Sequence, residues 1–245
     1  MPELPEVETV RAIIEREASG RTIAGVTFRA FPGVVGLHTP EQFAALVTDR
    51  TIQTPVRRGK FLLLPLDDET ALVVHLRMTG RLLVTAADVP PVRFEHLALH
   101  LDNDADLRFS DQRKFGRVLH MLRDDAERSL SRLGPEPLSP HFNARYLAER
   151  ANGRTAPVKS FLLDQRHIAG LGNIYVDEAL FLSRIHPLAP AGALTERDIT
   201  SLVRSIRKVL RASIANQGTT FATFENPYGE RGNNAGALKV YGRAK

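Results

Sequence analysis

The first six residues, MPELPE, put a proline directly behind the initiator methionine and crowd two carboxylates, Glu3 and Glu6, against it. A cytoplasmic aminopeptidase usually removes Met1 when the next residue is small, and Pro2 would then carry a free secondary amine. An α-amino group titrates near ~8, so a sizeable fraction of it is neutral and nucleophilic at pH 7. Proline also suits the start of a helix, where its missing N–H would have no partner. Taken alone, the stretch favours the helix start.

A lysine follows a turn glycine in RRGKFLL, residues 57–63. The glycine presents Lys60 at the start of an apolar strand. Taken alone, such a lysine is most simply a solvated surface residue.

Two further stretches, HLRMTGR (75–81) and SDQRKFGR (110–117), each place an apolar side chain beside a turn glycine and among arginines. These side chains are Met78 and Phe115. They are explained equally well as core residues or as a wedge that enters a DNA base step while arginine fills the vacated space or holds phosphate.

The stretch KSFLLDQRHIAGLGNIYVDEALF (159–181) indicates two short helices around the tight turn GLGN, with Asn173 beginning the second. Gly170 and Gly172 would let another backbone approach closely, and N–H groups at a helix start favour an anion. We therefore expect a phosphate site that needs no sequence reading, with Lys159 ahead and Asn173 behind. Glycine pairs alone are weak evidence, because they occur in many loops.

The composition is that of an ordinary globular protein, with 43% hydrophobic and 25% charged residues among 245. No run approaches ~18 apolar residues, so no membrane span is expected. The absence of cysteine excludes disulfides, thiol catalysis and cysteine zinc sites in these residues, and the eight histidines show no metal spacing. We expect a cytoplasmic protein.

The net charge of +5 is unevenly divided between the two halves. Residues 1–140 carry 18 Lys and Arg against 20 Asp and Glu, whereas residues 141–245 carry 15 against 8. A basic second half indicates a polyanionic partner, although a solvated surface gives the same count.

The hydrophobic spacing predicts an α+β protein. A helix over residues 4–18 precedes seven or eight short apolar strands, interrupted by one short helix near 40–48. HLALHL-DNDA-DLRFS has the pattern of a hairpin. These features favour an antiparallel β-sandwich with an N-terminal helix.

Three prolines and a glycine in LGPEPLSPHF (133–142) mark a domain boundary, which divides the chain into residues 1–136 and 137–245. The second domain is predicted to be helical, with helices at 143–151, 157–164, 173–183 and 195–217. Residues 225–237 are expected to form a mobile glycine-rich loop that leads into a strand.

Taken in order, PELPEVET, RRGK, HLRMTG, DQRKFG, GLGNIY and KVYGR resemble the motifs of the formamidopyrimidine-DNA glycosylase / endonuclease VIII family. The likeness spans nearly the whole chain. Leu4 favours the formamidopyrimidine-DNA glycosylase branch, since members of the other branch typically begin PEGPE. The resemblance implies a β-sandwich domain followed by a helical domain with a helix-two-turns-helix motif.

The resemblance also implies a reaction. Family members remove oxidised purines, chiefly 8-oxoguanine and formamidopyrimidines, from double-stranded DNA and cleave the abasic strand by β- and δ-elimination. Pro2 matches the nucleophile that forms a Schiff base with the sugar. Glu3 matches the general acid/base, and Lys60 matches a lysine that contacts the lesion or its phosphate. No metal or diffusible cofactor is required.

Other matches concern DNA contacts. Three positions match phosphate-binding residues of the helix-two-turns-helix: Lys159, Gly172 and Asn173. Three more match the triad that fills the gap left by a flipped-out base: Met78, Arg113 and Phe115.

The resemblance leaves the roles of two residues open. His75 could hold a phosphate or be a structural histidine. Glu6 could orient the damaged base or be a helix N-terminal carboxylate favoured by the dipole. The loop 225–237 corresponds to a segment that closes over the extruded base, and Tyr228 within it is assigned to base recognition.

The sequence departs from the family pattern after KVYGR, which normally leads into a hairpin with four zinc-binding cysteines and a minor-groove arginine. A lone strand is a poor place for a domain to stop, so we expect the natural chain to continue beyond Lys245. One structural zinc is expected only if that hairpin exists there, and no metal is expected within these residues.

The sequence thus predicts a bifunctional DNA glycosylase and lyase that acts as a monomer on damaged duplex DNA. Two alternatives stay open. A non-catalytic module that binds damaged DNA would keep the clamp without the chemistry. A protein that binds structured RNA through the helix-two-turns-helix would leave the N-terminal proline and its carboxylates without a purpose.

Overall fold

The computed structural model, which describes residues 1–221 and 223–243, folds its first half into two four-stranded antiparallel sheets. Their strand orders are β1-β6-β7-β5 and β2-β3-β4-β8. The strands are β1 (Ile23–Phe28), β2 (Val56–Arg58), β3 (Phe61–Pro65), β4 (Thr70–His75), β5 (Gly80–Ala86), β6 (Glu95–Leu101), β7 (Ala105–Asp111) and β8 (Arg117–Leu122). The sandwich and the β6–β7 hairpin are therefore confirmed.

The apolar runs of β3 and β4 are buried on both faces. Leu62 and Leu64 point into the core between the sheets, whereas Leu63 packs outward against helix α3 (Arg123–Leu130). This helix was not predicted, because RDDAERSL supplies only Ala126 and Leu130 as buried residues.

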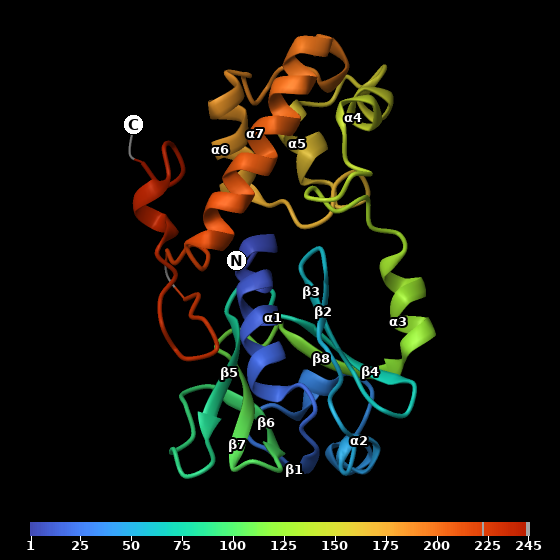
Figure 1. Ribbon diagram of the computed structural model, residues 1–245, viewed down its shortest axis with the longest axis vertical. Coiled ribbons are helices and arrows are strands. Elements are labelled where there is room, and N and C mark those ends of the chain that lie inside the picture. Colours follow the sequence, from blue (N-terminus) through green and yellow to red (C-terminus); the bar gives the residue numbers. More distant parts are fainter. Residues whose placement is uncertain (222, 244–245) are drawn as a thin grey trace.

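Helix α1 (Leu4–Ala18) joins the two halves of the molecule (Figure 1). Val7, Val10 and Ile14 belong to the core of the sandwich, but Leu4 belongs to the core of the helical half. The first turn of α1 therefore lies at the junction of the two cores.

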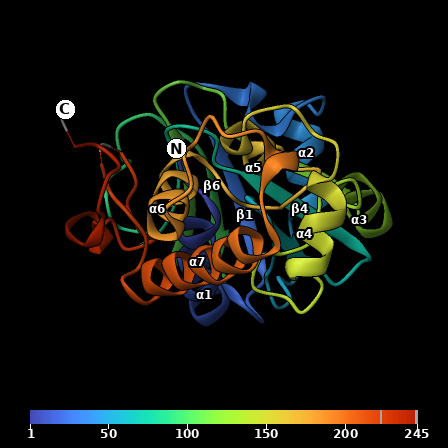
Figure 2. The same ribbon diagram turned by 90° about the horizontal axis from the view of Figure 1, so that it is seen from above.

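The second half is helical, as predicted (Figures 1 and 2). Its helices are α4 (Ala144–Ala151), α5 (Val158–Leu163), α6 (Asn173–Ser183) and α7 (Glu196–Ala215), with a short 3-10 turn η2 (Ala191–Ala193). Thr195 and Asp198 exchange the hydrogen bonds of a capping box at the start of α7, at 3.2 and 3.0 Å. In the first half, α2 (Pro40–Val47) confirms the short helix expected there, and η1 (Pro32–Val35) precedes it.

The strand predicted at KVYGR is wrong. The segment before it forms a 3-10 turn, η3 (Asn234–Ala237), and residues 238–243 form bends and turns. The backbone N–H groups of Lys239, Val240 and Tyr241 donate to the buried Glu178 carboxylate at 2.8–2.9 Å. That carboxylate satisfies amides that a strand would pair with a neighbour, and Gly242 has a positive φ that interrupts an extended chain.

Within the described ranges, no helix has both the length and the apolar character needed to cross a membrane. The division of the chain after residue 136 stays a prediction.

Candidate active site at the first turn of α1

The start of the chain is held against the turn between α5 and α6. Pro2 is buried, and the N–H of Leu4 donates to the carbonyl of Gly170 at 3.1 Å. Gly170 has a φ of +88°, and a Cβ there would lie 2.8 Å from Leu4. The GLGN turn therefore needs glycine at this position so that the N-terminus can approach closely.

Glu3 lies at the N-terminus of α6. Its carboxylate accepts hydrogen bonds from the N–H groups of Gly172 (2.8 Å) and Ile174 (3.0 Å), and only 2% of the residue is exposed. Burial raises the pKa of Glu3 to about 7, although Lys60 and the Ile174 amide oppose the shift. A Cβ on Gly172 would lie 2.3 Å from the Glu3 carboxylate carbon, so only glycine leaves room for it.

This arrangement revises the expected phosphate site. The N–H groups of Gly172 and Ile174 already hold an anion, the Glu3 carboxylate, and the Gly170 N–H donates to the Gln165 side chain. Asn173 is exposed at the start of α6. Asn173 therefore stays a candidate for phosphate binding, whereas Gly172 serves Glu3.

Glu6 connects three separate segments. One carboxylate oxygen accepts the N–H of Glu3 at 2.8 Å, and the other accepts the N–H of Thr219 at 2.7 Å and the hydroxyl of Tyr175. The Tyr175 hydroxyl also contacts Ser213 and Thr219. Burial raises the pKa of Glu6, and these donors oppose that shift. Glu6 is thus a helix N-terminal carboxylate that also fixes the segment following α7.

Lys60 is buried, contrary to the solvated surface residue that its motif alone would suggest. Gly59, with a φ of +57°, packs near Gly170, and its N–H donates to Glu136 at 2.6 Å. Arg57 links this turn to Glu8 of α1 at 2.8 Å. Burial lowers the pKa of Lys60, and the nearby Glu3 and Glu6 oppose that shift. The structure therefore brings Lys60 together with the two carboxylates.

The proposed wedge residues lie on two adjacent turns and are exposed. Met78 is 44% and Phe115 51% exposed, so neither is a core residue. The Arg113 guanidinium lies 2.9 Å from the Met78 sulfur and 4.9 Å from the centre of the Phe115 ring. Asp111 accepts the N–H groups of Arg113 and Gly116 at 3.1 and 2.7 Å, which fixes one turn. The three side chains thus form one surface cluster.

His75 lies at the end of β4, with its ring 4.5 Å from the Phe61 ring between centroids. Burial and the neighbouring Arg77 and Lys60 lower the pKa of His75 to about 4. The ring is therefore neutral at pH 7. Its Nδ1 accepts the N–H of Arg77 at 3.0 Å, which leaves the Nε2–H as a donor for a phosphate.

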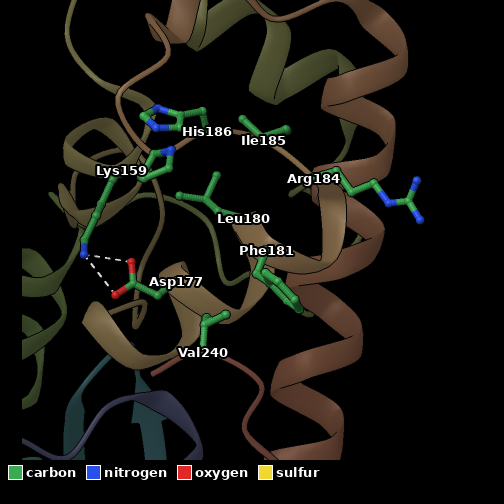
Figure 3. A pocket seen from close by; sticks show the side chains of 9 residues that line it. Lys159, Asp177, Leu180, Phe181, Arg184, Ile185, His186 and Val240 are labelled. Carbon is green, nitrogen blue, oxygen red and sulfur yellow. Dashed lines mark hydrogen bonds and ion pairs between the residues drawn. The ribbon is translucent and has the colours of Figure 1, made fainter. Parts of the chain in front are cut away.

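Lys159 on α5 forms an ion pair with Asp177 on α6, with Nζ 2.7 Å from a carboxylate oxygen (Figure 3). The pair borders a pocket of about 710 Å³ whose apolar lining includes Leu180, Phe181 and Val240. A phosphate that binds Lys159 would have to replace Asp177 or share the lysine with it.

Tyr228 is not brought to the site. Its hydroxyl contacts Arg16 and Glu17 in the last turn of α1. A 15-residue helix is roughly 20 Å long at about 1.5 Å per residue, so this end lies far from Pro2. The assignment of Tyr228 to base recognition therefore has no support in this structure.

No cluster of three or more His, Asp or Glu side chains suited to a metal ion occurs in the part of the chain that the structure describes.

Comparison with known proteins places these observations in a family. The model of the formamidopyrimidine-DNA glycosylase N-terminal domain matches residues 1–118, and that of the formamidopyrimidine-DNA glycosylase H2TH domain matches residues 133–225. A formamidopyrimidine-DNA glycosylase of Herpetosiphon aurantiacus is 46% identical, over 99% of this chain and 89% of the relative. One of Chloroflexus aurantiacus is 47% identical, over 100% of this chain and 87% of the relative.

The chain belongs to the formamidopyrimidine-DNA glycosylase family. Members of this family are DNA glycosylases of base excision repair. The solved complex of the Lactococcus lactis family member with DNA that contains an abasic site has a TM-score of 0.91 and 36% identity, over 98% of this chain and 88% of that chain. A mutant of the same protein with DNA containing Fapy-dG gives the same values. The α+β fold predicted from the sequence is therefore confirmed.

Sequence reasoning missed part of the site that this family member builds. Tyr175 and Thr219 hold Glu6, yet only Tyr175 lies in a quoted motif, GLGNIY. Its position two residues after Asn173 places it on the buried side of α6, which was the available signal. Thr219 follows Gly218 at the end of α7 and carries no motif of its own.

Proposed function

We propose that this family member excises oxidised purines, such as 8-oxoguanine and formamidopyrimidines, from duplex DNA and then cleaves the abasic strand, with the amine of Pro2 as nucleophile. The solved relatives of similar fold bind DNA with Fapy-dG, an abasic site or an oxidised pyrimidine. These ligands support damaged duplex DNA as the partner of this chain. The work would take place in the bacterial cytoplasm, at the nucleoid.

The observation that carries the proposal is the state of Glu3. Its carboxylate directly follows Pro2 in the chain, is 2% exposed, and has a pKa raised to about 7 by burial. A group with a pKa near the working pH is the most effective proton donor and acceptor. Glu3 therefore exists in both protonation states at neutral pH, which suits a residue that must give and take protons.

The chemistry begins when removal of Met1 frees the Pro2 nitrogen. Its lone pair attacks C1′ of the damaged nucleotide and displaces the base, which leaves with the proton of the Pro2 nitrogen. The lone pair of that nitrogen then expels the ring oxygen of the sugar, and protonated Glu3 gives its proton to that oxygen. The product is an iminium, in which the positively charged nitrogen acidifies the 2′ proton. Loss of that proton expels the 3′ phosphate, a second elimination expels the 5′ phosphate, and water releases the amine. The nitrogen supplies the electron sink, so the sequence of steps needs no metal or diffusible cofactor.

The remaining residues prepare the nucleotide. Lys60, with its lowered pKa and its place beside Glu3, would hold the lesion or its phosphate. The cluster of Met78, Arg113 and Phe115 would fill the gap that the flipped-out base leaves in the DNA duplex. It would thereby offset the few kcal/mol of stacking and pairing free energy that are lost when the base leaves. His75 and Asn173 would donate hydrogen bonds to phosphates.

Borohydride trapping with a matched pair of proteins tests the proposal. One form carries an uncleaved N-terminal tag, and the other has the same tag removed to leave Pro2 first. With an 8-oxoguanine duplex, only the form that begins with Pro2 should yield a covalent adduct, and mass spectrometry of its peptides should place the DNA on Pro2. Equal strand scission by the tagged form would refute the role of Pro2. Tight lesion binding without scission by either form would indicate the non-catalytic module.

A further inference from the structure

The outer face of α7 carries a line of positive charge that the proposed reaction does not use. Four exposed cations recur at helical spacing along it: Arg197, Arg204, Lys208 and Arg211. We call this set the basic stripe. The opposite face of α7 buries apolar residues in the core, including Leu202, Ile206 and Leu210. At about 1.5 Å per residue, the stripe is roughly 20 Å long.

The cations of the basic stripe are not held in ion pairs by the neighbouring described residues. Among the described residues, none of the four cations forms an ion pair, whereas exposed arginines on other helices do. Arg128 of α3 pairs with Asp125, and Arg145 of α4 pairs with Glu149. The basic stripe is therefore open to an external anion.

A hollow of about 400 Å³ lies beside the stripe, against the last turn of α6. Its lining consists of Leu182, Arg197, Ser201, Arg204, Ser205 and Lys208. Three cations and two hydroxyl groups face this space, and no carboxylate does. Cationic side chains and serine hydroxyls are the groups that bind phosphodiester oxygens in protein–DNA contacts.

The stripe lies on a different helix from Lys159, one of the residues expected to hold the damaged duplex. Lys159 lies on α5, and α6 packs against both α5 and α7. Seen from above, α5 and α7 lie on opposite sides of the helical half (Figure 2). A short duplex resists smooth bending, since its persistence length is about 150 base pairs, so the duplex held at the Pro2 site is not expected to wrap round to the basic stripe.

We propose that the basic stripe binds the phosphate backbone of a second DNA duplex while the first occupies the Pro2 site. This contact goes beyond the proposed reaction. Neutralising phosphates with Lys and Arg releases counterions, so binding is independent of sequence and falls steeply with salt. Such a contact would let the protein hold a neighbouring DNA segment while it searches for lesions.

The test compares two variants with the same loss of charge. The stripe variant carries R197Q, R204Q, K208Q and R211Q. The control removes four exposed arginines elsewhere, from α3, the residues just after it, and α4: R128Q, R132Q, R145Q and R150Q. Glutamine is a good helix former, so α7 should persist, and thermal melting checks that it does. Each protein is first trapped by borohydride on a 16-base-pair lesion duplex, and an undamaged fluorescent duplex of the same length is then titrated by anisotropy.

The trapped unsubstituted protein and the control should bind the second duplex. The stripe variant should bind it at least 10-fold more weakly, and its slope of log K against log salt should fall by about 3 to 4, at about 0.9 per phosphate contact. A trapped protein that binds no second duplex, or a stripe variant that matches the control, would overturn the proposal. Binding of polyglutamate as tightly as the second duplex would also overturn the proposal, because it would show that the stripe attracts any polyanion rather than DNA.

Failure of the adduct to form would count against the proposed reaction and not against the stripe. In that case the number of undamaged duplexes bound per free protein decides the matter. Two per unsubstituted chain and one per stripe variant support the second site, and one for both refutes it.

Discussion

Glu3 and Glu6 are 2% and 1% exposed and receive hydrogen bonds from the α6 N-terminus, Tyr175 and Thr219. Met78 and Phe115 are about half exposed, and Arg113 is their common neighbour. The carboxylates are thus fixed before DNA arrives, and burial has already set their pKa values. The wedge residues instead leave about half of their surface uncovered, and the bases of a distorted duplex would cover it. Groups that move protons are preorganised here, and groups that deform DNA are left uncovered.

The largest effect should come from removing the proton of Glu3. E3Q keeps the size of the side chain but cannot give or take a proton, so single-turnover excision of 8-oxoguanine should fall by about 10²–10⁴-fold. E15Q makes the same change on the surface of the same helix, where Glu15 pairs with Arg11, and should leave excision unaltered. An E3Q protein with full activity would remove Glu3 from the mechanism.

E3Q also has a signature in stability. The pKa of Glu3 is about 7 in the folded protein against an ordinary 4.5, so folding favours its protonated form. Protonation of Glu3 therefore adds on the order of 3 kcal/mol to the free energy of unfolding. This contribution is fully present below pH 4.5 and is lost as the pH rises through 7. Chemical unfolding at pH 5 and pH 8 should show a smaller pH dependence for E3Q than for the unsubstituted protein. An unchanged pH dependence would show that Glu3 is not held as described.

The next effect should follow from displacing Glu3 without altering it. In G172A, the new Cβ would lie 2.3 Å from the Glu3 carboxylate carbon and would push it out of place. A misplacement of about 1 Å costs on the order of 10² in rate, so excision should fall about 100-fold. Binding to undamaged duplex should persist. G236A is the matched control, because a Cβ on Gly236 meets nothing within 4 Å.

A smaller effect is expected at the wedge. F115A removes an exposed ring, so the melting temperature should not change, since surface substitutions usually alter stability by less than about 0.5 kcal/mol. Excision from a paired duplex should fall about 10-fold, because the Phe115 ring would no longer offset part of the stacking free energy that is lost when the base flips out. L122A removes a side chain that is also about half exposed, at the end of β8, and should have no effect. A large stability loss in F115A would make Phe115 a structural residue and would break the contrast with Glu3.

The comparison also explains what the sequence could and could not reveal. Helix periodicity located α1 and α7 because their buried faces repeat locally, the GLGN turn located the start of α6, and the turn glycine before Lys60 located that lysine. The burial of Lys60 could not be foreseen, because the turn before it is held by a distant residue: the N–H of Gly59 donates to Glu136, which lies 77 residues along the chain. The strand predicted after residue 238 is wrong for the same reason. The backbone N–H groups that a neighbouring strand would have paired donate instead to the side chain of the distant Glu178. Local patterns thus reveal elements, whereas the contacts that set burial and pKa join distant segments.

The smallest effect tests the ion pair between Lys159 and Asp177, whose side chains are 34% and 25% exposed and so lie between the buried carboxylates and the wedge residues. D177N should strengthen binding to undamaged duplex by a few-fold, because a phosphate would no longer compete with a carboxylate for Lys159, and such pairs are worth about 0–1 kcal/mol. D125N removes a carboxylate from a more exposed ion pair on α3, with Arg128, and controls for net charge. Titration at two salt concentrations measures both. Weaker binding by D177N would mean that Asp177 orients Lys159 toward the DNA, which would place the pair with the preorganised carboxylates rather than with the wedge.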